Sequence, residues 1–285
     1  AAAQTLISAS QSFNNLTIKN TSASGVILAD ALSVGGNLYL SADGANNVLL
    51  DAATNNPDVA VTGDLDFTGA GGGTESISMG NSTWTVGGDV NFTDGTIDDG
   101  SSTLVMNGDG KTLTANSQIL YNLTLENNIT FADSFTVANL FKCITASKTL
   151  TFTSGQTYTL NDIELDGQAV GTRVTLAPLG GTAYNWNVTA DPQTDVSYVD
   201  VSYCNASTGS EIDASNGTNN DGDNNLNWDF GVTISGTCRQ YDQSSNCADA
   251  ETVRVAINGV LQAETGTTST GSWSISYFTL SSDDV

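Results

Sequence analysis

The chain has 285 residues and a net charge of −24, because 31 Asp and Glu residues outnumber 7 Lys and Arg residues. An acidic surface repels nucleic-acid phosphates and anionic lipid headgroups, so we expect no nucleic-acid partner. No apolar run reaches the length of about 18 residues that a membrane helix needs, so we expect no membrane insertion.

Short runs of alternating apolar and polar residues follow one another along the chain. Most end at Gly, Asn or Asp, as β-strands do. No stretch of about 12 residues has the periodicity of an amphipathic helix. The sequence therefore predicts an all-β protein, and the clearest runs, in chain order, are NLTI (15–18), VILAD (26–30), NLYLSA (37–42), NVLLDA (47–52), VAVTG (59–63), DLDFTG (64–69), STWTVGG (82–88), STLVMNG (102–108), KTLTAN (111–116), NLTLEN (122–127), KTLTFTSG (148–155), TYTLND (157–162), RVTLAP (173–178), YNWNVTA (184–190) and VSYVDVSYC (196–204).

Two stretches of the chain repeat each other. TLISASQSFNNLTIKN (5–20) is similar to TLTANSQILYNLTLEN (112–127), and VILADALSVGGNLYL (26–40) is similar to ITFADSFTVANLFKC (129–143). Internal similarity favours a right-handed parallel β-helix, or β-solenoid, over an antiparallel sandwich or barrel, although D-G pairs typical of hairpins also occur. At about 20–25 residues per coil, residues 1–230 would form about nine to eleven coils.

The repeated motif also gives expectations for single side chains. Its apolar residues are expected to point into the core, namely Leu16, Ile18, Leu123 and Leu125. Thr17 and Thr124 alternate with them and are expected to point outward. Asn15 and Asn122 are expected at matching places in their coils, either as corner ladder residues or as sequons.

The character of the sequence changes after Phe230. Residues 231–285 are typical of the opening strands of a small Ig-like or prealbumin-like β-sandwich. The segment is short for such a domain and stops at SSDDV, where another strand is expected. We therefore expect a module that is incomplete or is completed by a strand from a neighbouring chain.

Several motifs of the first part occur together in one kind of protein. NLTLENNITFADSFTVANLFKC (122–143), RVTLAP, VSYVDVSYC and the closing NLNWDF (225–230) together resemble the C-terminal coils of repeat-rich secreted bacterial surface proteins, including adhesins and autotransporter passengers. The resemblance covers roughly residues 5–230. It implies a parallel β-helix and a location at the cell surface, and it carries over no catalytic residue.

The four cysteines are consistent with a secreted chain. Cys238 and Cys247 flank a short polar loop in the second part and are expected to form a disulfide. Cys143 and Cys204 lie two to three coils apart, so they form either a second bridge or two buried free thiols. With no His and no CxxC pair, a zinc site is not expected.

One segment, NNDGDNN, has oxygen ligands at alternate positions around a glycine, as calcium loops do. Its expected ligands are Asn219, Asp221, Asp223 and Asn225, and calcium is the cofactor that they would bind. The alternative is an Asx-rich turn that closes the solenoid.

The start AAAQTL is typical of a chain from which a signal peptide has been removed. In a secreted protein, N-x-S/T sequons are candidate glycosylation sites. Nine occur here, at Asn15, Asn20, Asn81, Asn91, Asn122, Asn128, Asn187, Asn205 and Asn216.

The residues available for catalysis are few. Without His, the Ser-His-Asp and Cys-His arrangements are excluded. Carboxylate pairs such as Asp64/Asp66, Asp98/Asp99 and Asp221/Asp223 are expected by chance in so acidic a chain. We therefore expect no enzyme, with a β-helix polysaccharide lyase or glycosidase as the remaining enzymatic alternative.

Exposed aromatic residues could instead stack on sugars, and the candidates are Trp84, Trp186, Tyr184 and Tyr203. The alternative places these side chains in the core. A glycan-binding surface adhesin is therefore the second functional hypothesis, with surface glycans as partners.

The first hypothesis is an extracellular structural protein. It would be a subunit or stalk of a surface fibre, sheath or surface layer, with copies of itself as partners in a homopolymer. Open strand edges and coil ends present unpaired backbone groups, so assembly would use β-edge or end-to-end contacts.

Overall fold

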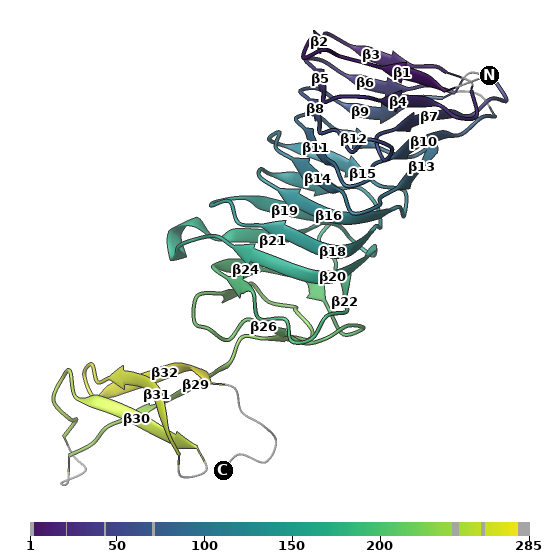
Figure 1. The fold of residues 1–285 in the computed structure, drawn as a ribbon. Helices are drawn as coiled ribbons and strands as arrows, with labels where there is room; N and C mark the ends of the chain where they lie inside the picture. The colour runs from purple at the N-terminus through teal and green to yellow at the C-terminus, as the bar shows by residue number, and fades with distance from the viewer. Residues whose placement is uncertain are drawn as a thin grey trace.

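The computed structural model describes residues 3–20, 22–42, 44–69, 72–240, 245–257 and 260–278. It confirms an all-β fold, a parallel β-solenoid followed by small antiparallel sheets. Figure 1 shows the coils stacked along one axis, from the purple N-terminal end to the green turns, with the yellow C-terminal strands beyond them. In the described residues the only helical element is the 3₁₀ turn η1 (Val170–Thr172), and no helix there is long and apolar enough to cross a membrane.

The solenoid is built from three parallel sheets, here named A, B and C. Sheet A contains β1 (Gln4–Leu6), β4 (Val26–Leu28), β7 (Val48–Asp51), β10 (Glu75–Ser78) and β13 (Gly95–Asp98). Sheet B contains β2 (Ser12–Phe13), β5 (Leu32–Val34), β8 (Val59–Val61), β11 (Thr83–Val86), β14 (Thr103–Met106), β16 (Ile119–Leu125), β18 (Thr136–Cys143), β20 (Thr157–Asp166), β22 (Tyr184–Val188), β23 (Val196–Ser197) and β25 (Cys204–Asn205).

Sheet C gives the number of turns. Its ten strands are β3 (Leu16–Ile18), β6 (Leu38–Leu40), β9 (Leu65–Phe67), β12 (Val90–Asn91), β15 (Lys111–Thr114), β17 (Ile129–Phe131), β19 (Thr149–Thr153), β21 (Val174–Leu179), β24 (Val199–Val201) and β27 (Asn220–Asp221). One strand per coil gives about ten turns, within the range expected from the sequence. A short pair, β26 (Ile212–Asp213) with β28 (Trp228–Asp229), closes the C-terminal end.

The core is a set of columns in which side chains of successive coils stack. In sheet C, for example, Leu38 pairs with Leu65 and Leu65 with Val90, and all three are fully buried. In the later coils, aromatic residues take the inward positions that aliphatic residues occupy in the earlier ones. Phe152 stacks on Tyr184 with ring centroids 4.6 Å apart and lies 4.7 Å from Phe131. One apolar core therefore runs through the length of the solenoid.

Sheet A ends at β13 because a side chain takes the place of the next strand. The amide of Gln118 accepts a hydrogen bond from the Ile97 N–H (3.1 Å) and donates one to the Gly95 carbonyl (3.0 Å). Next in sheet B come its three longest strands, β16, β18 and β20, with seven, eight and ten residues. The register of β18 against both neighbours shifts by one residue, at a bulge between Val137 and Leu140.

The repeated motif does not occupy equivalent places in its two coils, so that expectation is wrong. Leu16 and Ile18 belong to sheet C, whereas Leu123 and Leu125 belong to sheet B. The side chains do point as expected, because inward and outward positions alternate along any strand. The second copy lies one face further round the solenoid than the first.

Glycine and Asx residues form a ladder at the corner that precedes sheet C. The side-chain oxygen of Asn15 accepts the N–H of Asn37 (2.8 Å), Asn37 accepts that of Asp64 (2.9 Å), and Asp64 accepts that of Asp89 (2.9 Å). A Cβ at Gly63 would lie 2.0 Å from Asn37 Oδ1. The residue before each bonded Asx residue is therefore a glycine, because the ladder oxygen of the preceding coil occupies the space that its side chain would need.

The C-terminal module consists of two antiparallel pairs. β29 (Val232–Thr237) pairs with β32 (Ser272–Phe278), and β30 (Thr252–Ile257) pairs with β31 (Val260–Thr267), which fits an Ig-like module. The expected disulfide between Cys238 and Cys247 is confirmed, with Cα atoms 5.3 Å apart. The SSDDV end of the module, on which the expectation of a missing strand depends, lies outside the described residues.

Candidate functional site

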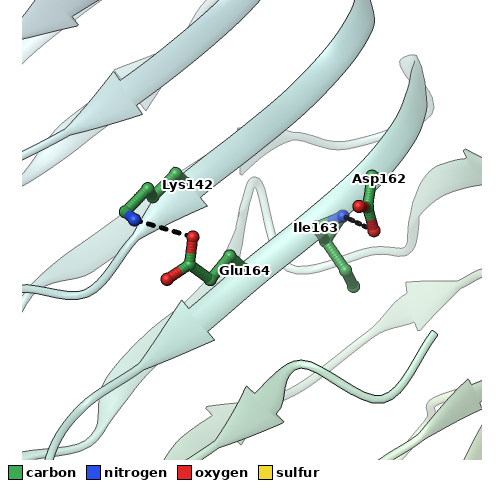
Figure 2. Close-up of polar contacts among 4 residues, drawn as sticks. All are labelled: Lys142, Asp162, Ile163 and Glu164. Atoms are coloured by element: carbon green, nitrogen blue, oxygen red, sulfur yellow. Dashed lines mark hydrogen bonds and ion pairs between the residues drawn. The ribbon is translucent and has the colours of Figure 1, made fainter.

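The outer face of sheet B holds an ion pair that sequence reasoning missed. Lys142 on β18 lies directly opposite Glu164 on β20, and Lys142 Nζ is 2.7 Å from Glu164 Oε2 (Figure 2). The two side chains are 28% and 35% exposed. Both point outward because Phe141 and Ile163, the residues before them, point into the core.

A second carboxylate, Asp162, lies two residues before Glu164 but is turned away from the pair (Figure 2). Its Oδ1 accepts the N–H of Ile163 at 2.9 Å. The same N–H also donates to Gln193 Oε1 at 3.2 Å. Asp162 therefore completes the backbone bonding beside the β18 bulge, and its carboxylate does not converge with that of Glu164 on Lys142.

This geometry limits what the three residues do chemically. A general acid or base must exchange a proton with a substrate within hydrogen-bond reach. Glu164 is held by Lys142, and Asp162 by its own strand. The pair is placed to hold β18 and β20 in register, as opposite charges on facing residues of neighbouring strands do.

Comparison with protein-family models, with curated proteins and with solved structures finds no match to this chain. The function proposed below therefore depends on the fold and on the side-chain geometry alone.

Three of the four expected calcium ligands, Asn219, Asp221 and Asn225, are held by side-chain hydrogen bonds within the protein, whereas Asp223 takes part through its backbone. Asn219 is buried, and its Oδ1 accepts the Val199 N–H at 2.9 Å. Asp221 Oδ1 accepts the N–H of Asp223 (3.0 Å) and the side-chain amide of Asn225 (2.6 Å). These contacts are those of the Asx-rich turn, the alternative interpretation, and calcium binding stays a prediction. Among the described residues, no three His, Cys, Asp or Glu side chains gather into a metal-binding group.

Acidic residues also line a hollow of about 340 Å³ on sheet C, which contains the Asp64/Asp66 pair. Asn91 donates to Asp66 Oδ1 at 2.9 Å. Burial raises the pKa of Asp66 against the lowering effect of this hydrogen bond, and the charges of Asp64 and Asp94 raise it further. The other two carboxylate pairs, Asp98/Asp99 and Asp221/Asp223, do not line this hollow. Asp98 accepts a hydrogen bond from Ser78 on the face of sheet A.

One glutamate is enclosed completely. Glu75, at the start of β10, has no exposed surface, and its Oε1 accepts the Ala42 N–H at 2.7 Å. Its Oε2 has no hydrogen-bond partner among the residues that the structure describes. A Cβ on Gly69 would lie 1.8 Å from Oε1, so a glycine at that corner makes room for the carboxyl group. The sequence carried no signal for this burial, because Glu75 looks like any polar residue beside a glycine-rich loop.

The structure gives three of the nine sequons a role in turns. In each, the Asn Oδ1 accepts both the N–H and the hydroxyl of the Ser or Thr two residues later, in the pairs Asn91/Thr93, Asn205/Ser207 and Asn216/Thr218. Asp213 makes the same two bonds to Ser215 without forming a sequon. The hydrogen bonds of these turns therefore account for the N-x-S/T spacing at the three sites without glycosylation.

The asparagines of the other six sequons differ in the hydrogen bonds that their side chains make. Hydrogen bonds between coils use the side chains of Asn15, Asn122 and Asn128. The side chain of Asn20 bonds Gln4 within the first coil and accepts the N–H of Ser22. In the part of the chain that the structure describes, the side chains of Asn81 and Asn187 make no hydrogen bond. Asn81 is exposed, whereas Asn187 is half-buried. Asn81 is thus the sequon best placed to carry a glycan, and occupancy stays a prediction.

The aromatic residues considered for sugar stacking lie mostly in the core. Trp84, Tyr184 and Trp186 have no exposed surface, so a role in sugar stacking is wrong for them, and Tyr203 is half-buried. For these three residues the alternative interpretation, a place in the core, is confirmed. They occupy inward positions on alternating strands, and the inward positions of these coils take the largest side chains.

Cys143 and Cys204 are two buried free thiols, the second of the alternatives left open by the sequence. Cys143 pairs with Leu165 on β20, whereas Cys204 pairs with Tyr184 on β22, so the two lie in different columns of sheet B. Burial raises the pKa of Cys143 to about 11 and that of Cys204 to about 12. Both thiols therefore stay protonated at neutral pH and serve as core residues.

Proposed function

We propose that this protein is an extracellular structural protein, a subunit or stalk of a surface fibre, sheath or surface layer. The observation that carries the proposal is the unbroken core, which runs through about ten turns without opening into a deep binding site in the described residues. Each coil packs only on its neighbours, so added coils extend the rod without changing its cross-section.

Polar ladders support a role as a stiff spacer. The Asn15–Asn37–Asp64–Asp89 ladder bonds every coil that it crosses to the next. Ten strands at about 4.8 Å spacing correspond to a rod of roughly 45 Å. A rod of this kind holds its two ends at a fixed separation, which is what a stalk or a lattice subunit needs.

The acidic surface also suits this role. Long exposed sheets associate sideways unless charge or edge protection prevents it, and a net charge of −24 opposes such contacts. The alternative, a glycan-binding adhesin, is less well supported, because Trp84, Tyr184 and Trp186 are buried and unable to stack on sugars. A lyase or glycosidase would need carboxylates that converge on a basic residue, and Glu164 and Asp162 do not converge.

Surface labelling of the source cells tests the proposal. Antibodies against the purified chain should label intact cells in immunogold electron microscopy, and the label should follow regular filaments or a layer. Permeabilised cells are the control for internal protein. Label found only after permeabilisation, or depolymerisation of polysaccharides by the purified chain, would overturn the proposal.

A further inference from the structure

The turn between β14 and β15 carries an Asn–Gly pair, Asn107–Gly108. β14 ends at Met106 and β15 begins at Lys111, so the pair belongs to neither strand. Asn107 is exposed, and its side chain makes no hydrogen bond to any residue that the structure describes. The amide group of this side chain is therefore free to turn toward its own backbone.

The backbone nitrogen that follows Asn107 is free as well. Within the described part of the chain, the N–H of Gly108 donates to no acceptor. The N–H of Asn107, by contrast, donates to the Val86 carbonyl at 3.1 Å. An unbonded backbone nitrogen thus lies directly after an unbonded side-chain amide.

The stacking of the coils requires glycine at position 108. A Cβ there would lie 1.8 Å from the carbonyl oxygen of Gly87, which belongs to the preceding coil. A side chain on the residue after an asparagine shields its backbone nitrogen from the asparagine amide, and glycine has no side chain. The fold therefore places the least shielded kind of backbone nitrogen directly after an exposed asparagine.

A second Asn–Gly pair, Asn216–Gly217, provides a matched comparison. Asn216 is also exposed, but its side-chain amide makes four hydrogen bonds. Its Nδ2 donates to the Val196 carbonyl at 2.7 Å, and its Oδ1 accepts from the N–H and the hydroxyl of Thr218 and from the amide of Asn219. Several of these bonds must open before the amide can turn to the Gly217 nitrogen.

We propose that Asn107 is a site of spontaneous deamidation, in which water converts its side-chain amide to a carboxylate through a cyclic imide. The Gly108 nitrogen gives up its proton to water and attacks Cγ of Asn107, so a new C–N bond forms. The Cγ–Nδ2 bond breaks, and the leaving nitrogen takes up a proton and departs as ammonia. Water then opens the ring at either of its two carbonyl groups, which leaves aspartate or isoaspartate at position 107.

The isoaspartate product changes the contact between coils. In this product the side-chain carbon becomes part of the main chain, which is lengthened by one carbon atom. The lengthened segment starts at the N–H that bonds Val86 and ends at Gly108, which packs against Gly87. The carbonyl of Asn107 also accepts the side-chain amide of Asn127, in the following coil. Isoaspartate therefore loosens the bonding of this coil to the coils on both sides.

Incubation of the folded whole chain at pH 8, followed by peptide mass mapping, tests the proposal. The chain is produced in a host without N-glycosylation, because Asn216 belongs to a sequon. Asn107 should deamidate, and Asn216 should react more slowly by on the order of a hundredfold, because several hydrogen bonds must open first. In guanidinium the two sites should react at similar rates, because the fold no longer distinguishes them. The third Asn–Gly pair, Asn258–Gly259, lies outside the described residues and is followed on its own peptide.

Two variants separate the reaction from its consequence. Asn107→Gln keeps an amide but needs a larger ring, so it should abolish deamidation at position 107 and leave the rate at Asn216 unchanged. Asn107→Asp carries the new charge on a main chain of normal length. Incubated protein that is enriched in isoaspartate should melt at a lower temperature than Asn107→Asp. Circular dichroism establishes that each variant folds.

Two results would overturn the assignment of the site. One is an Asn107 that stays intact in the folded chain while both sites react in guanidinium. The other is a folded chain in which Asn107 and Asn216 react at equal rates. If isoaspartate-rich protein melts together with Asn107→Asp, the loosening of the coil is overturned.

Discussion

Asp30 and Asp133 accept the same pair of backbone hydrogen bonds on two different faces of the solenoid. The carboxylate of Asp30 binds the N–H groups of residues 8 and 9 at 2.7 and 2.8 Å, and that of Asp133 binds those of residues 115 and 116 at the same distances. Each turn continues through two left-handed residues, with φ near 50° and 60° in both copies. The repeated unit is therefore a strand, a turn and a strand, which can be placed on any face.

Asp30 should make the stability of the first coils depend on pH. The hydrogen bond from Ser8 N–H holds the pKa of Asp30 below its usual 3.8. A carboxyl whose pKa is lowered by folding stabilises the fold above the unfolded pKa, and that stability is lost as pH falls through the folded pKa. We expect Asp30→Asn to weaken the first coils at pH 7 and to flatten the acid dependence of unfolding. Thermal melts between pH 7 and pH 2 measure this, and an unchanged acid slope in the variant would contradict it.

Gly63 should be intolerant of a side chain. A Cβ there would meet Asn37 Oδ1 at 2.0 Å and the Gly36 carbonyl oxygen at 2.8 Å. We expect Gly63→Ala to lower the free energy of unfolding by about 1–3 kcal/mol, as overpacked sites do. Gly171→Ala is the matched control, since no atom lies within 4 Å of its added Cβ. Urea unfolding compares the two, and equal midpoints would show that the ladder tolerates the methyl group.

The Lys142–Glu164 pair should contribute little, and its contribution should depend on salt. Partly exposed pairs of this kind are worth about 0.2–1 kcal/mol, and added salt screens them. A double-mutant cycle with Lys142→Met and Glu164→Gln should give a coupling energy in that range at low salt and less in 1 M salt. A coupling of several kcal/mol that salt does not change would mean that the pair belongs to a buried network.

The two free thiols should react only after unfolding. Burial raises the pKa values of Cys143 and Cys204 to about 11 and about 12, and the thiolate is the reactive form. With iodoacetamide at pH 8, the native protein should gain no label on these residues, and the protein in guanidinium should gain two. The disulfide between Cys238 and Cys247 serves as internal control, since it should stay unlabelled in both states without reductant. Labelling of the native chain at either thiol would show that its coil opens.

Sequons should differ in their ability to carry a glycan. Asn81 is exposed, whereas the amide of Asn122 bonds Thr103 and Asn139 across three coils. In a eukaryotic secretory host, peptide mass mapping should find glycan at Asn81 and none at Asn122 in folded material. Asn81→Gln should remove that glycan and leave the melting temperature unchanged, and Asn122→Gln should lower it. Folded protein with glycan at Asn122 would contradict the role of its amide.

Strand positions and side-chain direction could be predicted from sequence, because both are local. The alternation of Leu16, Thr17 and Ile18 is enough to place the first and third inward, whichever sheet receives the strand. The calcium hypothesis, by contrast, used a spacing that turns share. The contacts of Asn219 and Asp221 are those of an Asx-rich turn, and calcium binding stays a prediction.

The amino-acid sequence by itself determined an all-β chain, a stacked core of about ten coils, and the disulfide of the module. The tertiary structure decided which coil lies against which. Residues paired across coils at the corner are separated by 22 positions for Asn15 and Asn37 but by 27 for Asn37 and Asp64. Because coil length varies, sequence spacing does not give the register between coils. That register brings Lys142 to Glu164, separates Cys143 from Cys204, and moves the repeated motif to another face.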